Sequence, residues 1–105
     1  MRFEDLNWMD VENYLKKDDR LMVVVGACEQ HGYLSLQTDV RIPQTLADAA
    51  SKQTGVIIAP AVNFGISPYF LKYPGTLSLR TSTLLQVMED VIRSAAGSGF
   101  RRILV

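Results

Sequence analysis

Segments with helical hydrophobic spacing alternate along this chain with short, continuously apolar runs. The first helical segment has Trp8, Val11 and Leu15 at intervals of three and four residues, which predicts a short amphipathic helix. Asn7 precedes this segment and Asp10 follows three residues later, a pair typical of a capping box at a helix start. The chain is therefore expected to enter its fold through a short, capped helix.

Two further helices are predicted. One is expected to open at Ile42-Pro43, because proline is favoured at the first helical position, and to stop at Gly55. Within it, Asp48 is expected to be a solvated surface charge. The other has the strongest pattern of the chain and is expected to end at Gly97 and Gly99. Its apolar face consists of Leu84, Val87, Met88, Val91, Ile92 and Ala95.

Two apolar runs between the helices, at residues 21–25 and 56–60, predict buried strands, and residues 101–105 (Arg-Arg-Ile-Leu-Val), after the last helix, predict the start of a third. Runs of this kind, rich in Val and Ile, are typical of parallel strands that are covered on both faces. The order helix, strand, helix, strand, helix, strand predicts an α/β fold, a layered α/β/α arrangement around a largely parallel sheet. Residues 1–105 are expected to form a single domain.

Residues 61–80 break this regular alternation. Gly65, Pro68, Pro74 and Gly75 interrupt any helical or strand pattern there. Irregular segments of this length inside compact domains are commonly functional, so the segment is a candidate part of a site.

Composition narrows the class of protein. The 105 residues carry 11 basic and 11 acidic side chains, so the formal net charge is zero, and neither a nucleic acid nor an anionic membrane surface is an expected partner. No apolar run approaches the roughly 20 residues of a membrane span, and the N-terminus lacks the apolar core of a signal peptide. The single cysteine fits a reducing compartment. The sequence thus predicts a cytoplasmic protein.

The only histidine of the chain lies between two carboxylates, just after the first predicted strand. In open parallel sheets, sites form in loops beyond the carboxyl ends of strands. Glu29, His31 and Asp39 fall within residues 27–41, the loop expected there, and imidazole with carboxylate suits zinc, manganese or iron-group ions. On the residues alone, a plainer interpretation is favoured. In it, His31 packs or hydrogen-bonds within the loop, while the carboxylates cap the helix of Pro43 or face solvent.

Other candidate groups are weaker. Cys28 could act as a nucleophile, but no second histidine exists to activate it, and small buried residues are common at strand ends. No serine of the loops lies in a recognisable nucleophile elbow. Tyr69, Phe70 and Tyr73 either line a pocket or interface, or simply cover the sheet as loop side chains.

Several short motifs, taken together and in order, resemble the creatininase family, also called creatinine amidohydrolases. The resemblance covers the chain from about Asn7 onward, and each motif alone is modest. The matching elements are the strand end Val25-Gly26, the run Glu29-Gln30-His31-Gly32, the pair Thr38-Asp39, the pair Ala59-Pro60, the element Pro74-Gly75-Thr76-Leu77-Ser78 and the strand entry Gly99-Phe100-Arg101-Arg102-Ile103.

The resemblance implies a creatininase-like metal-dependent amidohydrolase that holds two divalent ions (Zn, Mn or Fe) and forms a homo-oligomer. It implies that Glu29 and His31 are ligands to different metals and that Asp39 bridges them. A metal-activated water would then hydrolyse a non-peptide C–N bond, of the cyclic amide or formamide type, in a small-molecule amide substrate. Candidates for lining the substrate pocket are Tyr33, Ser67, Tyr69, Phe70 and Tyr73.

This chain also departs from the family pattern. Tyr33-Leu34-Ser35 stands where the family commonly has a second histidine and a proline, and Tyr69-Phe70 stands where it often has Glu-His. Both changes replace polar groups near the pocket, which argues against creatinine itself as the substrate. The chain reaches Val105 before the family's Asn-Gly-His-Gly-Gly-Asn motif. It is therefore expected to be the N-terminal part of a longer creatininase-like domain, incomplete and inactive alone.

A second function class stays open. The chain is then a non-catalytic fragment or an assembly domain that keeps the fold but has an incomplete metal site. In that case the aromatic loop, residues 64–73, would make contacts between subunits.

Overall fold

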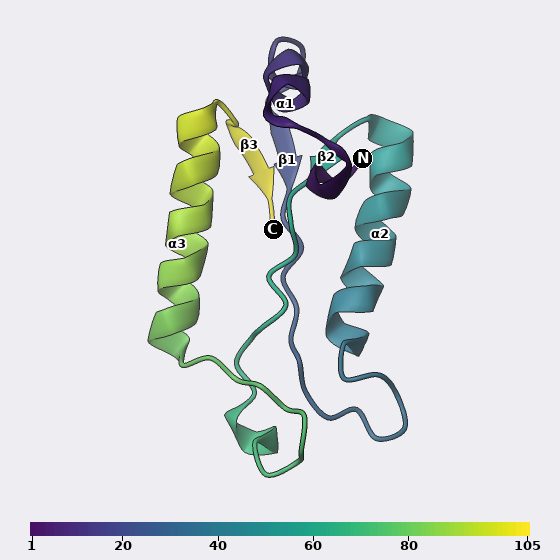
Figure 1. Cartoon of the computed structure of the whole chain (residues 1–105), viewed down its shortest axis with the longest axis vertical. Helices are drawn as coiled ribbons and strands as arrows, with labels where there is room; N and C mark the ends of the chain where they lie inside the picture. Colours follow the sequence, from purple (N-terminus) through teal and green to yellow (C-terminus); the bar gives the residue numbers. More distant parts are fainter.

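The computed structural model describes all 105 residues, and its elements follow the predicted alternation (Figure 1). The three strands are parallel, in the order β2-β1-β3. The helices are α1 (Trp8–Leu15), α2 (Thr38–Thr54) and α3 (Thr81–Ser98), and the strands are β1 (Arg20–Met22), β2 (Ile57–Ile58) and β3 (Arg102–Leu104). Short 3-10 turns lie at Phe3–Asp5 and Pro68–Phe70.

The central strand β1 packs against helices on both of its faces. Successive side chains of a strand point to opposite faces of its sheet, and Leu21 and Val23 pack with Phe100 and with residues of α1 and α3. Met22 and Val24 face the other way and pack with α2 through Ala47 and Ala50. Figure 1 shows α2 and α3 on opposite sides of the strands. The predicted α/β/α layering and parallel sheet are therefore confirmed.

Strand pairing continues beyond the short regular strands. Val62 N–H donates to the Val24 carbonyl and Gly26 N–H to the Val62 carbonyl, both at 2.9 Å. The chain therefore leaves β1 in an extended, paired course as far as Gly26, which agrees with the predicted strand at residues 21–25. The loop that carries the candidate metal ligands starts from this fixed point.

The start of α2 differs from the prediction. The helix begins at Thr38 rather than at Ile42-Pro43, so Pro43 lies inside it. A preceding turn makes this possible: the Thr38 N–H and hydroxyl both donate to the Ser35 carbonyl, at 3.0 and 2.6 Å. Pro43 removes a single helical hydrogen bond, the one to the Asp39 carbonyl. As a result Asp39 belongs to the first turn of a helix and not to a loop.

The helix boundaries are otherwise close to prediction. The Asn7 side chain accepts hydrogen bonds from the backbone N–H groups of Met9 and Asp10. The Asp10 carboxylate in turn accepts one from the Asn7 N–H, which confirms the capping box of α1. Gly55 ends α2 with φ 72°, as expected. Gly99 alone ends α3, because Gly97 is still helical.

Asp48 is not the solvated charge that its place on a helix suggested. Its carboxylate accepts a hydrogen bond from Arg2 Nε at 2.9 Å, and about two thirds of its side chain is shielded from solvent. Arg2 in turn pairs as an isolated bridge with Ile58 of β2. The Arg2 guanidinium lowers the pKa of Asp48, so this ion pair holds the N-terminal segment against α2.

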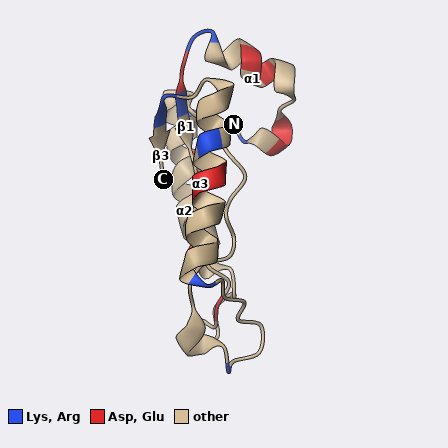
Figure 2. Ribbon diagram, turned by 90° about the vertical axis from the view of Figure 1, so that its left-hand side faces the viewer, with Lys and Arg blue, Asp and Glu red and all other residues tan.

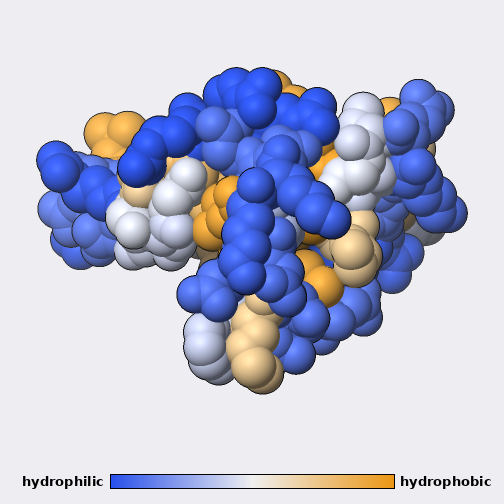
Figure 3. All heavy atoms as spheres, turned by 90° about the horizontal axis from the view of Figure 1, so that it is seen from above, coloured by the Kyte–Doolittle hydropathy of each residue, from blue (hydrophilic) through white to orange (hydrophobic).

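Charged residues are unevenly distributed along the molecule. Figure 2 shows Lys, Arg, Asp and Glu residues on α1, near the strands and midway along α3, and few around the loops at the end opposite α1. Viewed from the α1 end, hydrophilic residues cover most of the face, with hydrophobic atoms visible between them (Figure 3). None of the helices is both long and apolar enough to cross a membrane.

Candidate metal site

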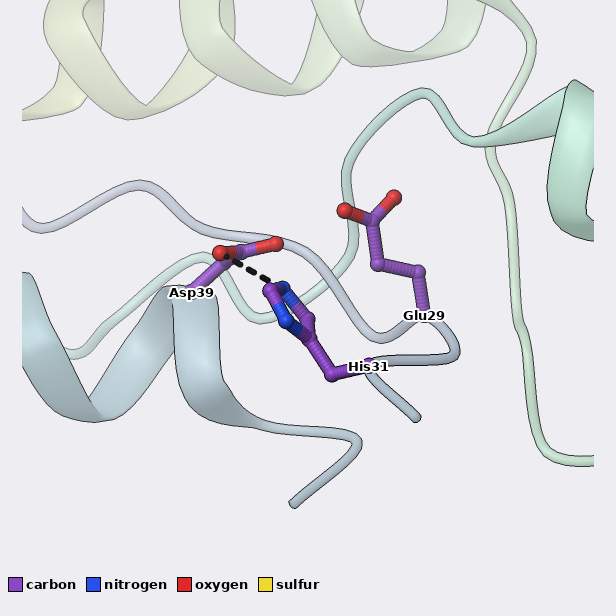
Figure 4. A group of neighbouring side chains, drawn as sticks. All are labelled: Glu29, His31 and Asp39. Atoms are coloured by element: carbon purple, nitrogen blue, oxygen red, sulfur yellow. Dashed lines mark hydrogen bonds and ion pairs between the residues drawn. The ribbon is translucent and has the colours of Figure 1, made fainter. Parts of the chain in front are cut away.

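Glu29, His31 and Asp39 come together at the loop end of the sheet (Figure 4). Glu29 and His31 lie on the loop that follows β1, and Asp39 faces them from the first turn of α2. One potential ligand atom from each residue lies within 4.8 Å of the others. The closest contact joins His31 Nε2 to Asp39 Oδ1 at 3.1 Å. All three side chains are half-buried, so an ion could reach them from solvent.

The loop holds its shape through its own backbone. Glu29 N–H donates to the Leu36 carbonyl at 3.1 Å, which closes the loop, and Leu34 N–H donates to the His31 carbonyl at 3.0 Å. Between them, Gly32 adopts φ 59°, a left-handed conformation that glycine takes without the steric penalty other residues incur. This turn directs His31 back toward α2.

A second glycine brings the helix close to the loop. A side chain on Gly26 would meet the Asp39 carbonyl oxygen and a methyl of Val40 at 2.6 Å each. Only a residue without Cβ therefore allows α2 to begin directly against the strand end. Gly26 thus sets how near the Asp39 carboxylate lies to Glu29 and His31.

The donor set fits a divalent ion. Ligands of a tetrahedral zinc ion at about 2.0–2.1 Å lie roughly 3.4 Å from one another, close to the 3.1 Å between His31 Nε2 and Asp39 Oδ1. One imidazole and two carboxylates also suit manganese or iron. The plainer interpretation agrees with the structure in part, because His31 hydrogen-bonds to Asp39 and Asp39 lies, partly exposed, in the first turn of α2. No side chain caps the start of α2, and the Asp39 carboxylate is turned toward His31.

The five candidate pocket residues lie in different surroundings. Tyr33 is fully exposed, Tyr69 and Tyr73 are exposed, and Phe70 lies between these two rings with centroid separations of 4.8 and 6.2 Å. Ser67 is completely buried, and its hydroxyl has no hydrogen-bond partner. Their role in a pocket stays a prediction.

Cys28 is buried, and its Sγ lies 3.5 Å from the Gly75 carbonyl oxygen. This contact is one of several between the loop and residues 74–78, which the sequence interpretation treated only as a family motif. Thr76, also buried, bonds to the loop through its hydroxyl. A single threonine in the turn Pro74-Gly75-Thr76 carries no signal of such a contact, so the sequence could not have identified it.

The fold and site define a class: a parallel α/β protein with a candidate metal centre beyond the carboxyl ends of its strands. The family model for creatininase, creatinine amidohydrolase, matches residues 4–105. The chain therefore belongs to the creatininase family.

Two curated relatives illustrate the range of this similarity. The chain is 31% identical over 108 residues to creatinine amidohydrolase of Pseudomonas putida, covering 96% of this chain and 42% of that protein. It is 36% identical over 83 residues to the mycofactocin precursor peptide peptidase of Mycolicibacterium smegmatis, covering 72% of this chain and 34% of that protein. The chain thus spans less than half the length of these relatives.

Solved structures agree with the family assignment. A crystal structure of creatinine amidohydrolase has a TM-score of 0.90 and 31% identity, covering 97% of this chain and 42% of that one. A manganese form of creatininase gives the same values, and a Zn–Zn form of a creatininase variant has a TM-score of 0.89. The layered fold expected from the sequence is therefore that of creatininases.

Proposed function

We propose that Glu29, His31 and Asp39 bind divalent metal in a hydrolase site of the creatininase type. The observation that carries the proposal is the meeting of one imidazole and two carboxylates, from two separate elements, beyond the carboxyl ends of parallel strands. Membership of the creatininase family supports it, because the curated relatives are named as hydrolases or peptidases. Divalent ions held here would activate a water molecule and polarise the carbonyl of an amide.

The three residues would have different roles in metal binding. Glu29 and His31 would each hold one of two ions, and Asp39 would be shared between the ions from the first turn of α2. Since the chain spans 42% of the length of creatinine amidohydrolase, we propose these residues as one part of a fuller ligand set. The substrate would be a small molecule with a cyclic amide or formamide-type C–N bond.

Two replacements argue against creatinine itself. Tyr33 is fully exposed directly after His31-Gly32, and Tyr69 is exposed beside Phe70. A small polar ring needs placed hydrogen-bond partners, whereas these side chains offer mainly aromatic surface. We therefore expect hydrolysis of a larger or less polar amide to exceed hydrolysis of creatinine.

Metal analysis of the purified protein tests the proposal. Dialysis against Zn²⁺ or Mn²⁺, followed by elemental analysis, should show bound metal in the wild-type chain and much less in Asp39→Ala. Asp90→Ala is the matched control, because Asp90 is an exposed helical carboxylate. Equal metal content in both variants would refute the ligand assignment.

The exposed aromatic loop favours an alternative, a binding or assembly domain. Tyr69, Leu71 and Tyr73 are 68%, 54% and 44% exposed within ten residues of chain, and aromatic side chains are enriched in interfaces. Light scattering of Tyr69→Ser separates the two functions. A wild-type oligomer that dissociates in this variant, together with no metal binding, would favour assembly over hydrolysis.

A further inference from the structure

The loop that carries Glu29 and His31 lies against a second segment, residues 74–78. Leu77 N–H donates to the Cys28 carbonyl at 2.9 Å, and these two residues form an antiparallel bridge. Thr76, the residue before Leu77, contacts Gln30, two residues after Cys28, through its side chain rather than its backbone. Its Oγ1 accepts a hydrogen bond from the Gln30 N–H at 3.1 Å.

Gln30 lies between the two candidate ligands, Glu29 and His31. The hydrogen bond from Gln30 to Thr76 therefore holds the backbone that carries both of them. The Gln30 nitrogen belongs to the planar peptide unit that joins Glu29 to Gln30. Holding that unit fixes the direction in which Glu29 leaves the backbone, and His31 follows one residue later. Neither the Gln30 N–H nor the Glu29 carbonyl makes a backbone–backbone hydrogen bond, so the bond to Thr76 is what holds this peptide unit.

Thr76 is suited to hold it. The residue is only 6% exposed, so water does not readily replace its hydroxyl as the acceptor. It precedes Leu77, whose backbone is already paired with Cys28. Gly75, just before it, has φ 96° and lies close to Leu36. The hydroxyl is thus carried by a turn that is itself packed on the far end of the ligand loop.

We propose that Thr76 is a positioning residue for the metal ligands Glu29 and His31. It does not bind metal itself. It fixes the peptide unit between the ligands so that both side chains converge on Asp39. This inference rests on the proposed metal site. The experiment below distinguishes failure of the metal site from failure of the positioning role of Thr76.

The test is the affinity for Zn²⁺, measured by competition with a chromophoric chelator. Loss of partners that orient metal ligands typically weakens metal binding about 10–100-fold, and Thr76→Val, which keeps the shape but removes the acceptor, should show a loss in this range. Thr76→Ser restores the hydroxyl and should bind within about threefold of wild type on the same reasoning.

Thr54→Val is the matched control. Thr54 Oγ1 also accepts a hydrogen bond from a backbone N–H, that of Val56, at 3.3 Å. It lies at the end of α2 opposite Asp39, about 22 Å along the helix axis. Its loss should affect folding stability but leave the Zn²⁺ affinity unchanged. Equal weakening by both valine variants would mean a general structural effect and would overturn the positioning role.

The remaining outcomes are also decisive. Wild-type affinity in Thr76→Val would overturn the positioning role and leave the metal site standing, whereas absence of Zn²⁺ binding by the wild-type chain would overturn both. If Thr76→Val does not fold, NMR measurements on the Gln30 amide of the wild-type chain test the positioning role instead. This amide should exchange slowly with deuterium and shift on addition of Zn²⁺ in NMR spectra, and rapid exchange without a shift would contradict the proposal.

Discussion

Gly26→Ala is expected to perturb the candidate metal site without replacing a candidate ligand side chain. The added methyl would lie 2.6 Å from the Asp39 carbonyl oxygen and from Val40 Cγ2, whereas ordinary van der Waals contact begins at 3.4 Å. The first turn of α2 must therefore retreat by the difference between 2.6 and 3.4 Å, about 0.8 Å, or the strand end must move as far. Backbone, rather than a flexible side chain, has to give way.

Both stability and metal affinity should fall in Gly26→Ala. Overpacking of this kind typically costs about 1–3 kcal/mol of folding free energy. The Asp39 carboxylate moves with the helix, so its 3.1 Å contact with His31 opens, and sites held more loosely than about 0.5 Å lose function. We expect Zn²⁺ to bind roughly 10-fold more weakly or worse, as when other groups that orient metal ligands are lost.

Urea unfolding and chelator competition measure the two effects, with Gly97→Ala as the matched control. Gly97 is helical, exposed and has nothing within 4 Å of an added Cβ. That substitution should stabilise the chain by up to about 1 kcal/mol and leave metal binding unchanged. If Gly26→Ala is as stable as wild type and binds Zn²⁺ equally well, the close approach of α2 does not position Asp39.

Two further predictions concern the scaffold. The pKa of Asp48 is lowered by Arg2, so its stabilising effect is present above the unfolded pKa, near 3.8, and is lost as the pH falls through the lower folded value. Urea unfolding between pH 6 and pH 2 should show a smaller acid loss for Asp48→Asn than for wild type, and parallel curves would contradict this. Phe100→Ala should cost about 3–5 kcal/mol, because the ring is 2% exposed and lies beside Phe3 and Tyr14. Thermal unfolding of this variant at the wild-type temperature would show that the ring is not central to the core.

The sequence was informative where local patterns decide the structure. The capping box at Asn7, the stop at Gly55 and the apolar runs of the strands depend on neighbouring residues, and the structure confirms them. The helix start predicted at Ile42-Pro43 is wrong, because Pro43 lies inside α2, which begins at Thr38 after a hydrogen-bonded turn. Here Ser35 holds that turn.

Long-range contacts were beyond the sequence. The Arg2–Asp48 ion pair joins residues 46 positions apart, and the hydrogen bond between Gln30 and Thr76 spans the same separation. No local pattern encodes either contact. The ligand types were visible in the chain, and their convergence was implied by family resemblance. What holds them in place emerges only when residues 74–78 fold against the loop.

The most direct test of the metal site uses the fact that the chain has a single histidine, His31. X-ray absorption of the Zn²⁺-loaded protein distinguishes imidazole from oxygen and sulfur ligands. One imidazole nitrogen is expected together with carboxylate oxygens at about 2.0–2.2 Å, and oxygen ligands should be lost in Asp39→Ala. A zinc environment without imidazole, or one with a sulfur at about 2.3 Å from the single thiol Cys28, would contradict it.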